Sequence, residues 1–314
     1  MRIVIPGGSG QVGQILARHF HARGDAVTVL SRAPRPAPWK TLQWDAKHLG
    51  PWTGEINGAD AVINLAGRSV DCRYTAANRR EILESRIQST RVLGQAIASA
   101  DCPPRLWINS STAAIYRHSL DRDMDDLTGE IGGSEPDVPS TWRFSIDVAT
   151  QWEHTFFAAG TPGTRQVALR SAMTMSPGRG GIFDVLLRMV RFGLGGTIGS
   201  GAQFISWIHD RDFIRAVEFL MAQEEMTGVV NLASPHPLPQ RDFIRILRET
   251  YGMPVGLPAA RWMVAIGAFL LRTETELILK SRRAVSKRLT DAGFAFDFPD
   301  WPRAAEDLVA RWRS

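Results

Sequence analysis

Residues 1–16 read MRIVIPGGSGQVGQIL, an apolar run followed by closely spaced glycines. Gly8, Gly10 and Gly13 have the spacing G-x-G-x-x-G. If the series starts at Gly7 instead, the spacing becomes G-x-x-G-x-x-G. Both patterns are typical of a loop between a strand and a helix, where the phosphates of a nucleotide approach the backbone closely. The stretch therefore predicts a β-strand, a nucleotide-binding loop and a helix whose N-terminus holds the phosphates.

Strand and helix patterns alternate through the first half of the chain. Short β-branched or apolar runs predict strands, and apolar residues repeated every three or four positions predict helices. The expected strands are 2–6, 26–30, 60–65, 106–109 and 166–169, and the expected helices are 11–23, 75–100 and 143–159. This order predicts an α/β Rossmann fold, a doubly wound parallel sheet with helices on both faces.

The pattern loosens from about Ser171 onward, where glycine-rich stretches occupy 178–181 and 193–201. The further helices expected are 212–223, 240–251 and 258–290, with a strand at 228–233. We therefore predict a nucleotide-binding Rossmann domain over 1–170 and a smaller C-terminal α+β lobe over 171–314. The lobe is expected to interleave with the core and to enclose a substrate.

The residue after the second strand distinguishes the two nicotinamide dinucleotides. An acidic side chain there binds the ribose hydroxyls of NAD(H), whereas an arginine can pair with the 2′-phosphate of NADP(H). Here the strand ends in Ser31 and Arg32, and no acidic residue follows until Asp45. A guanidinium beside a hydroxyl suits a phosphate monoester. The sequence therefore favours NADP(H), the alternative being that Arg32 points into solvent.

The composition argues against several other classes of protein. The 314 residues are 44% hydrophobic and 22% charged, which is ordinary for a globular protein. The segment from Trp262 to Leu271 is too short to span a bilayer and predicts a buried helix instead. No export signal is visible, so we expect a cytoplasmic location and no membrane contact. Cys72 and Cys102 are the two thiols, and they predict neither a metal site nor a disulfide framework.

The positive charge of the chain comes mainly from arginine. The net charge is +5, and the lysines are Lys40, Lys47, Lys280 and Lys287. The basic run KSRRAVSKR at 280–288 is interspersed with apolar residues, and we interpret it as the solvated face of a helix. A nucleic-acid surface is the less favoured alternative, because no recognition motif accompanies this short run. The expected partner is a small molecule, bound by a monomer or a homodimer.

Several motifs together resemble the extended short-chain dehydrogenase/reductase superfamily. They are GGSGQVG at 7–13, NLAG at 64–67, SSTAAIY at 110–116 and WIHDRDF at 207–213. Other stretches are similar to its atypical "epimerase family protein" branch, namely ESRIQST at 84–90, MSPGRGG at 175–181, FGLGGTIGSG at 192–201 and GFAFDFP at 293–299. The resemblance covers nearly the whole chain and implies a Rossmann fold that binds NADP(H). It selects Gly7, Gly10 and Gly13 as the loop glycines, with Gly8 as an extra turn residue.

The resemblance also implies which residues contact the cofactor. Small residues close the third strand, Glu81 and Arg86 lie on the helix that follows, and Thr174 stands just past the fifth strand. The full set of expected cofactor-binding residues is Gly7, Ser9, Gly10, Gln11, Val12, Gly13, Ser31, Arg32, Leu65, Ala66, Gly67, Glu81, Arg86 and Thr174. For Glu81 the alternative is a solvated carboxylate on the helix surface.

The usual catalytic pair of the superfamily is missing. Its members carry a Tyr-x-x-x-Lys pair and a Ser or Thr, in which the lysine lowers the pKa of the tyrosine that shuttles a proton. Here Phe144 and Val148 stand at the matching helix positions, and no lysine occurs between 48 and 279. We therefore expect Tyr116, supported by Thr112 and Ser111, to carry any proton transfer.

The histidines are expected to be structural. His209 and Asp212, in the WIHDRDF motif, are predicted to shape a turn and to cap a helix. His118 and His154 are predicted to lie at the surface.

Three functions stay open. The favoured one is an NADP(H)-dependent oxidoreductase or epimerase-like enzyme with a non-standard proton donor, acting on an unknown small molecule. The alternative is a catalytically silent NADP(H)-responsive binding or regulatory protein, which the missing catalytic pair favours. A sugar-nucleotide epimerase or dehydratase rests on analogy of fold alone.

Overall fold

The computed structural model describes residues 1–259 and 276–314. Within this part of the chain, seven strands form one sheet in the order β10-β6-β5-β4-β1-β2-β3. These strands are β1 (Arg2–Pro6), β2 (Ala26–Ser31), β3 (Lys40–Gln43), β4 (Ala61–Asn64), β5 (Leu106–Thr112), β6 (Arg165–Ser171) and β10 (Gly228–Leu232). All neighbouring pairs are parallel, so the carboxyl ends of the strands meet at one edge of the sheet. The predicted Rossmann fold is confirmed.

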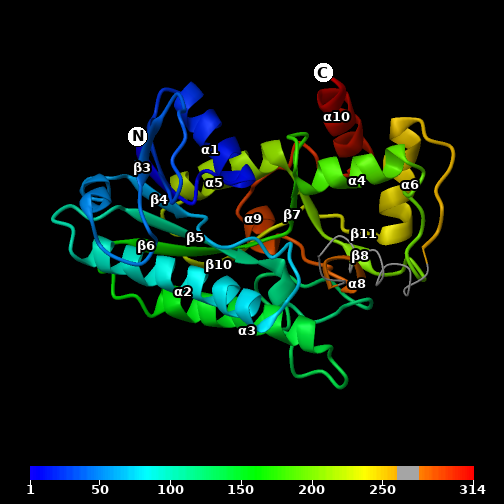
Figure 1. Ribbon diagram of the computed structural model, residues 1–314, viewed down its shortest axis with the longest axis horizontal. Coiled ribbons are helices and arrows are strands. Elements are labelled where there is room, and N and C mark those ends of the chain that lie inside the picture. The colour runs from blue at the N-terminus through cyan, green and yellow to red at the C-terminus, as the bar shows by residue number, and fades with distance from the viewer. Residues whose placement is uncertain (260–275) are drawn as a thin grey trace.

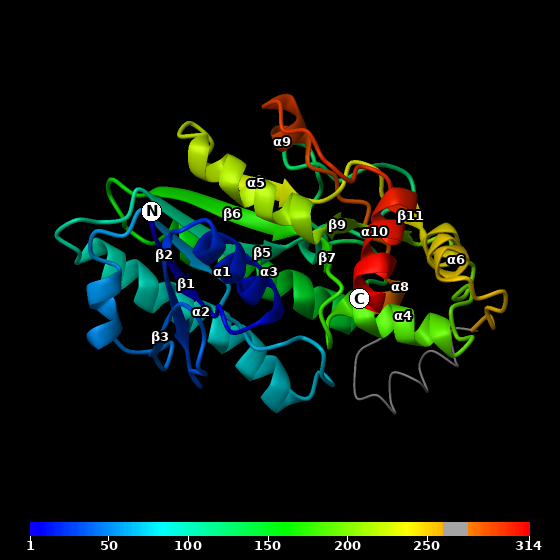
Figure 2. The same ribbon diagram turned by 90° about the horizontal axis from the view of Figure 1, so that it is seen from above.

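Helices cover both faces of this sheet (Figure 1), and Figure 2 shows α1 and α5 lying across it. The helices are α1 (Gln11–Ala22) and α5 (Asp210–Ala222) on one face, with α2 (Ala76–Ala98) and α3 (Ser140–Phe157) on the other. Alternation along β1 explains the two layers, because Ile3 and Ile5 pack with α1 and α5 while Val4 packs with α2 and α3. Each face buries its own apolar core, and this burial is the main driving force for folding.

Short 3-10 helices adjoin two of the strands, η1 (Pro51–Glu55) before β4 and η2 (Ala113–Ile115) after β5. In the first half of the chain the observed strands and helices lie within a few residues of the predicted ones, and β3 is a strand there that the sequence patterns did not predict. The short β3 pairs with β2 at the edge of the sheet, where tertiary pairing rather than local pattern decides the structure.

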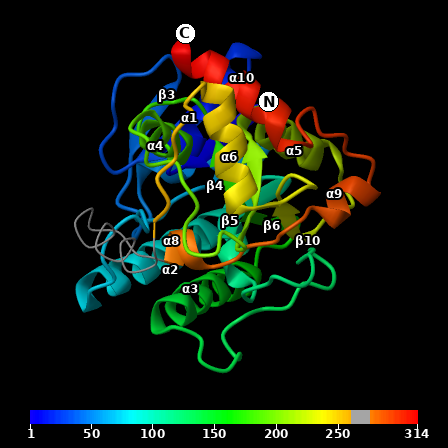
Figure 3. The ribbon, with the colours of Figure 1, turned by 90° about the vertical axis from the view of Figure 1, so that its right-hand side faces the viewer.

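The remaining elements build the smaller lobe around a third apolar core. They are β7 (Met173–Met175), α4 (Ile182–Arg191), β8 (Phe204–Ile205), β9 (Trp207–His209), β11 (Leu238–Pro239), α6 (Gln240–Tyr251) and α10 (Trp301–Arg313). Trp301 stacks on Phe243 with ring centroids 3.9 Å apart, and its indole N–H donates to the Phe243 carbonyl over 2.9 Å. This contact joins α10 to α6, which lie together in Figure 3. The division of the chain at residue 170 stays a prediction.

The basic run at 280–288 is not the solvated helix face that we predicted. Residues 280–286 connect α8 (Glu276–Leu279) to α9 (Lys287–Asp291) without forming a helix. Their backbone pairs on one side with Met124 and on the other with Phe204. Lys280 is buried at 1% exposure, and Ser281 is buried beside it. Long-range pairing of the backbone has therefore overridden the local helix pattern of this segment.

The single helix predicted over 258–290 is wrong, because residues 280–286 separate α8 from α9 and are not helical. The helix predicted over Trp262 to Leu271 lies outside the described residues. Among the helices that the structure describes, none is both long enough and apolar enough to cross a bilayer.

Candidate functional site

The glycine loop joins β1 to α1 at the carboxyl edge of the sheet. Gly7 has a φ of +77°, a conformation that favours glycine, and a Cβ there would lie 2.6 Å from the backbone nitrogen of Ala66. At Gly13 a Cβ would lie 2.4 Å from the Cα of Gly8. At Gly8 it would lie 2.8 Å from the carbonyl oxygen of Ile5, so this residue is a packing requirement as well as a turn residue. The fold itself therefore explains these three glycines.

Gly10 is different, because the nearest protein atom to a Cβ there would be the Gly7 carbonyl oxygen at 3.5 Å. Gly10 is exposed and forms the N-cap of α1, where no side chain caps the helix and no acidic residue stands in the first turn. The first N–H groups of a helix lack partners within the helix and attract anions. Nothing within the described chain requires glycine at position 10, whereas a phosphate against the backbone does.

The carboxyl end of β2 lies beside this loop. The hydroxyl of Ser31 donates to Ser9 Oγ over 3.1 Å, which joins β2 to the glycine loop. Arg32 is exposed, has no ion pair among the described residues, and lines an open pocket of about 370 Å³ with Gln43, Trp44 and Asp45. The Asp45 carboxylate faces its own turn, where it accepts from two backbone N–H groups and contacts the ring of His48. The Arg32 guanidinium is thus left available for a ligand.

The carboxyl end of β4 and helix α2 border the loop on its other side. Leu65, Ala66 and Gly67 follow β4, and a Cβ at Gly67 would lie 3.2 Å from Cζ of Arg86. Arg86 donates to the carbonyl oxygens of Arg68 and Ile82 at 3.1 and 2.9 Å. It has no carboxylate partner in the described part of the chain, and burial lowers its pKa to about 10.

Glu81 lies near Arg86 along α2 but has a protein partner. Its carboxylate forms an ion pair with Arg68 and is 60% exposed. The structure thus places Glu81 against the loop after β4, and its contact with a cofactor stays a prediction. Thr174 lies on β7, opposite Ile208 of β9, and is half-buried.

Gln11 provides a contact between the glycine loop and the lobe that the sequence patterns did not reveal. A Cβ at Gly181, the N-cap of α4, would lie 1.9 Å from Nε2 of Gln11. The MSPGRGG stretch therefore packs directly on the start of α1. The two residues are far apart in sequence, and no local pattern pairs them.

A buried polar network lies under the carboxyl ends of β5 and β6. The Glu153 carboxylate of α3 accepts from Ser111 Oγ at 2.6 Å and from Arg170 Nε and Nη2 at 2.8 and 2.7 Å. Arg170 Nη1 also donates to the Tyr116 hydroxyl at 3.1 Å, and that hydroxyl donates to Asn231 Oδ1 at 2.8 Å. The network ties β5, β6, β10 and α3 together.

Tyr116 is only 2% exposed, and burial raises the pKa of its phenol. Its hydroxyl already has two protein partners, which favours a structural role for Tyr116 and for the equally buried Ser111. Their predicted part in proton transfer stays a prediction. Thr112 is half-buried at the end of β5, and its Oγ1 accepts from the backbone N–H of Ala114 at 3.1 Å. Its hydroxyl donates no hydrogen bond within the described residues.

The helix face that carries the superfamily's catalytic pair is apolar here. Phe144 and Val148 pack with Tyr74 and Ile82, and the rings of Phe144 and Tyr74 meet edge to face with centroids 5.1 Å apart. The next residue, Ser145, donates its hydroxyl to the buried carboxylate of Glu276. Figure 3 shows α8, which carries Glu276, beside α3. The sequence patterns identified neither Ser145 nor Glu276.

The histidines hold elements together. His209 caps α5, because its Nδ1 accepts from the Arg211 N–H at 3.1 Å while its Nε2 contacts Asp307 at 3.0 Å. This confirms the predicted helix cap. Asp212 does not cap α5: it lies within the helix and accepts from the backbone N–H groups of Asp297 and Phe298. Asp212 thus binds a distant segment, which sequence spacing could not show.

The two histidines that were predicted to lie at the surface differ from each other. His154 is exposed, as predicted. His118 is half-buried, stacks on Trp142, and accepts from the Ser281 N–H at 3.1 Å. The surface assignment was therefore wrong for His118, because residues 280–286 pack against it.

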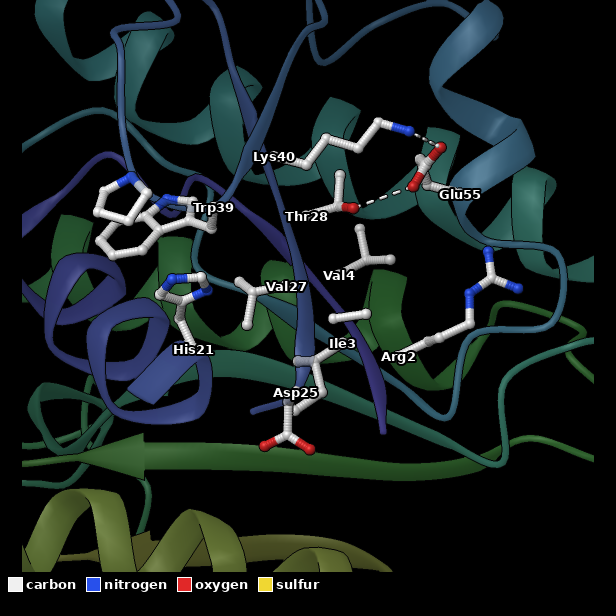
Figure 4. A pocket seen from close by; sticks show the side chains of 12 residues that line it. Arg2, Ile3, Val4, His21, Asp25, Val27, Thr28, Trp39, Lys40 and Glu55 are labelled. Atoms are coloured by element: carbon white, nitrogen blue, oxygen red, sulfur yellow. Dashed lines mark hydrogen bonds and ion pairs between the residues drawn. The ribbon is translucent and has the colours of Figure 1, made fainter. Parts of the chain in front are cut away.

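A second pocket, of about 330 Å³, lies at the opposite edge of the sheet, near the amino ends of β1, β2 and β3 (Figure 4). There Glu55 accepts from Lys40 Nζ at 2.7 Å and from Thr28 Oγ1 at 2.9 Å. Lys40 and Glu55 are thus paired with each other, and this pocket lies away from the glycine loop. The carboxyl edge is therefore the better candidate for a functional site.

The fold and the glycine loop define a Rossmann protein of the dinucleotide-binding class. Residues 3–233 match the "NAD dependent epimerase/dehydratase family", and residues 260–308 match a "Domain of unknown function (DUF1731)". The chain belongs to the NAD dependent epimerase/dehydratase family. The resemblance seen in its motifs is thereby confirmed.

Similar proteins span the whole chain. The epimerase family protein SDR39U1 of Bos taurus is 33% identical over 99% of this chain and 100% of its own length. The epimerase family protein YfhF of Bacillus subtilis is 29% identical, covering 99% of this chain and 98% of its own. The crystal structure of human SDR39U1 with NADPH has a TM-score of 0.85 and 28% identity over 99% of both chains.

More distant structures share the fold. A UDP-N-acetylglucosamine 4-epimerase from Bacillus cereus has a TM-score of 0.72 at 16% identity, with 99% of both chains covered. At this identity the likeness shows the Rossmann architecture and no common substrate.

Proposed function

We propose that the protein is an NADP(H)-dependent oxidoreductase or epimerase-like enzyme that acts on a small molecule. The observation that carries the cofactor assignment is Gly10, where a Cβ would meet no atom of the described chain closer than 3.5 Å at an uncapped helix N-terminus. A similar protein, human SDR39U1, has been crystallised with NADPH. The pyrophosphate would bind at the start of α1, where free N–H groups and the helix dipole favour negative charge.

Arg32 supplies the preference for NADP(H) over NAD(H). Its guanidinium is exposed beside Ser31 and has no carboxylate partner in the described chain. Bidentate hydrogen bonding to a 2′-phosphate would satisfy it. On the other side of the loop, Arg86 is a second cation without a carboxylate partner among the described residues. It lies against Gly67, at the end of β4, where the resemblance expects the cofactor.

Thr112 supports an enzymatic rather than a purely binding function. In open α/β sheets, ligands bind at the carboxyl ends of the strands. Thr112 ends β5 at this edge, and its hydroxyl proton has no acceptor within the described chain. Such a hydroxyl can donate a hydrogen bond to the oxygen of a carbonyl or alcohol substrate. Bound NADP(H) would supply or accept the hydride.

The test is a two-stage measurement on the full chain. NADPH and NADH are first titrated by fluorescence, with tighter binding of NADPH expected. The complex with NADPH is then mixed with panels of carbonyl, enone and imine compounds, and absorbance at the nicotinamide band is followed. Consumption of NADPH that stops in a Thr112→Val variant supports the proposal. Tight binding without consumption on any panel contradicts it.

The second candidate function is a catalytically silent NADP(H)-responsive regulator. Phe144 and Val148 favour it, because both pack in an apolar cluster and neither can carry a proton. A ligand-dependent change in the partners of the protein, with no turnover, is the result that this candidate predicts. A sugar-nucleotide epimerase is supported by the shared fold alone.

A further inference from the structure

Lys280 is a buried lysine at the carboxyl side of the sheet. Its side chain is 1% exposed, and its Nζ donates to the carbonyl oxygen of Ala114 over 2.7 Å. Within the described chain, no carboxylate oxygen lies within ion-pair distance of Nζ. An ammonium has three N–H donors, so two of them have no partner among the described residues. Burying a charge with so few partners opposes folding, and such groups are concentrated at functional sites.

Three charged groups act on the side chain of Lys280, two carboxylates and one guanidinium. Glu276 lies one helical turn earlier, Glu135 lies in the loop before α3, and both carboxylates act on Nζ through space. Arg282 acts in the opposite sense, and His118 contacts the neighbouring residue Ser281. Burial is the largest influence, and together with Arg282 it lowers the pKa of Lys280 to about 8. An amine in this range can both give and take a proton near neutral pH.

The position of Lys280 relates it to the missing catalytic pair. The carbonyl that it binds belongs to Ala114, two residues after Thr112 at the end of β5. Glu276 reaches the other side of the same region, where it accepts from Ser145, the residue next to Phe144. Lys280 therefore contacts η2 and Glu276 contacts α3, the helix on which Phe144 stands in place of the missing tyrosine.

We propose that Lys280 replaces the absent Tyr-x-x-x-Lys pair as the group that binds the substrate oxygen and exchanges a proton with it, with the nearby negative charge of Glu276 stabilising its ammonium form. This inference rests on the proposed function and extends it. It also assigns a role to a region matched only as a domain of unknown function. No lysine occurs between residues 48 and 279, so the lysine that reaches this region is Lys280, from the C-terminal part of the chain.

The proton step balances as follows for a carbonyl substrate. NADPH, when bound, would supply a hydride to the carbonyl carbon. The N–H bond of Lys280 breaks as the substrate oxygen gains the proton, which leaves a neutral amine and an alcohol. A proton from solvent then restores the ammonium. In the reverse direction the neutral amine takes the proton from the alcohol.

The scarcity of lysine makes a direct test practical. Growth on lysine labelled with ¹³C at Cε gives a spectrum with four side-chain signals, one for each lysine. The Lys40→Arg, Lys47→Arg and Lys287→Arg variants assign the three other signals, so Lys280 is identified by elimination without altering it. We expect its signal to titrate near pH 8 and to move when NADP⁺ is added.

Lys287 is the matched control on the same part of the chain. It is 46% exposed and pairs with Asp291, so its signal should titrate above the ordinary range for lysine and ignore NADP⁺. A Glu276→Gln variant should lower the pKa of Lys280 further, because it removes a stabilising negative charge. A Lys280 signal that titrates near 10.5, or that NADP⁺ leaves unmoved in a sample shown to bind it, overturns the inference.

Activity provides the second readout. Lys280→Met should reduce NADPH consumption by about 10²–10⁴-fold, the usual contribution of a general acid, while NADPH affinity is retained. Lys280→Arg keeps the positive charge, but a guanidinium does not exchange a proton near neutral pH, so this variant should also be inactive. If the Lys280 signal responds to NADP⁺ but no compound is turned over, the proposed reaction is contradicted and the location of Lys280 at the cofactor site is supported. If the protein does not bind NADP(H), both the proposed function and the inference about Lys280 are contradicted. Full turnover in Lys280→Met contradicts the inference about Lys280 alone.

Discussion

Gly181 at the start of α4 lies against the side-chain amide of Gln11 at the start of α1. A Cβ at Gly181 would be 1.9 Å from Nε2, so a larger residue there would have to displace the Gln11 side chain. We expect Gly181→Ala to displace Gln11 and to weaken NADPH binding by about threefold to tenfold, the equivalent of one lost hydrogen bond. Fluorescence titration measures this.

The same contact can be tested by combining two changes. Gln11→Ala should weaken binding to a similar extent, and the double variant should show no further loss, because both changes remove one interaction. Additive losses would show that Gly181 acts on the cofactor independently of Gln11.

Gly10→Ala and Gly13→Ala should separate cofactor binding from folding. The added methyl at residue 10 has no protein atom closer than 3.5 Å, so stability should be unchanged while NADPH affinity falls at least about tenfold. At residue 13 the methyl meets the Gly8 backbone, which should cost about 1–3 kcal/mol of stability. Thermal unfolding and NADPH titration of both variants check these outcomes. Equal affinity for NADPH in Gly10→Ala and wild type would contradict the placement of the pyrophosphate at the start of α1.

Arg32→Ala should change the preference between cofactors. Loss of a charge-assisted interaction should weaken NADPH binding by about tenfold to a hundredfold and leave NADH binding nearly unchanged. Arg35→Ala, at another exposed arginine of the same loop, is the control. An equal loss of affinity for NADPH and NADH would contradict the assignment of Arg32 to the 2′-phosphate.

Tyr116→Phe should lower the free energy of unfolding by about 1–3 kcal/mol, because the change leaves Asn231 Oδ1 and Arg170 Nη1 without their shared partner. Urea denaturation measures this loss. NADPH consumption per folded molecule then separates the two roles of Tyr116. Lost turnover at unchanged stability would identify it as the proton donor that its motif predicts.

His209 should make stability depend on pH. Burial lowers its pKa in the folded protein below the value of about 6.5 that it has when unfolded. Between the pKa values of the folded and unfolded states, the unfolded chain binds more protons at this histidine. The contribution of His209 to the free energy of unfolding is therefore complete above about pH 6.5 and is lost as the pH falls toward the pKa of the folded state. His209→Gln should therefore flatten the decline in unfolding free energy between pH 7 and 5. His154→Gln, at an exposed histidine with no ion pair among the described residues, is the control variant.

Sequence patterns predicted those features of the fold and the site that depend on residues close together in the chain. The glycine loop, the order of strands and helices in the first half and the Ser31-Arg32 pair all follow from short stretches of sequence. Lys280 was misinterpreted because its environment comes from Ala114, Glu135 and the pairing of residues 280–286 with distant segments. The same reason explains why Asp212 was taken for a cap and why Ser145 and Glu276 were not found. Contacts between segments that are far apart in the chain leave no periodic pattern in the sequence.

The pairing of residues 280–286 also sets an order of assembly during synthesis. The last strand of the sheet ends at Leu232, and Lys280 follows about 50 residues later, which corresponds to roughly 2–10 s of translation. The glycine loop and all seven strands thus emerge from the ribosome before the lysine does. A nascent chain therefore passes through a stage at which the glycine loop has been made and Lys280, the proposed proton donor, has not. Premature termination in this interval would release a polypeptide that has the glycine loop but lacks Lys280.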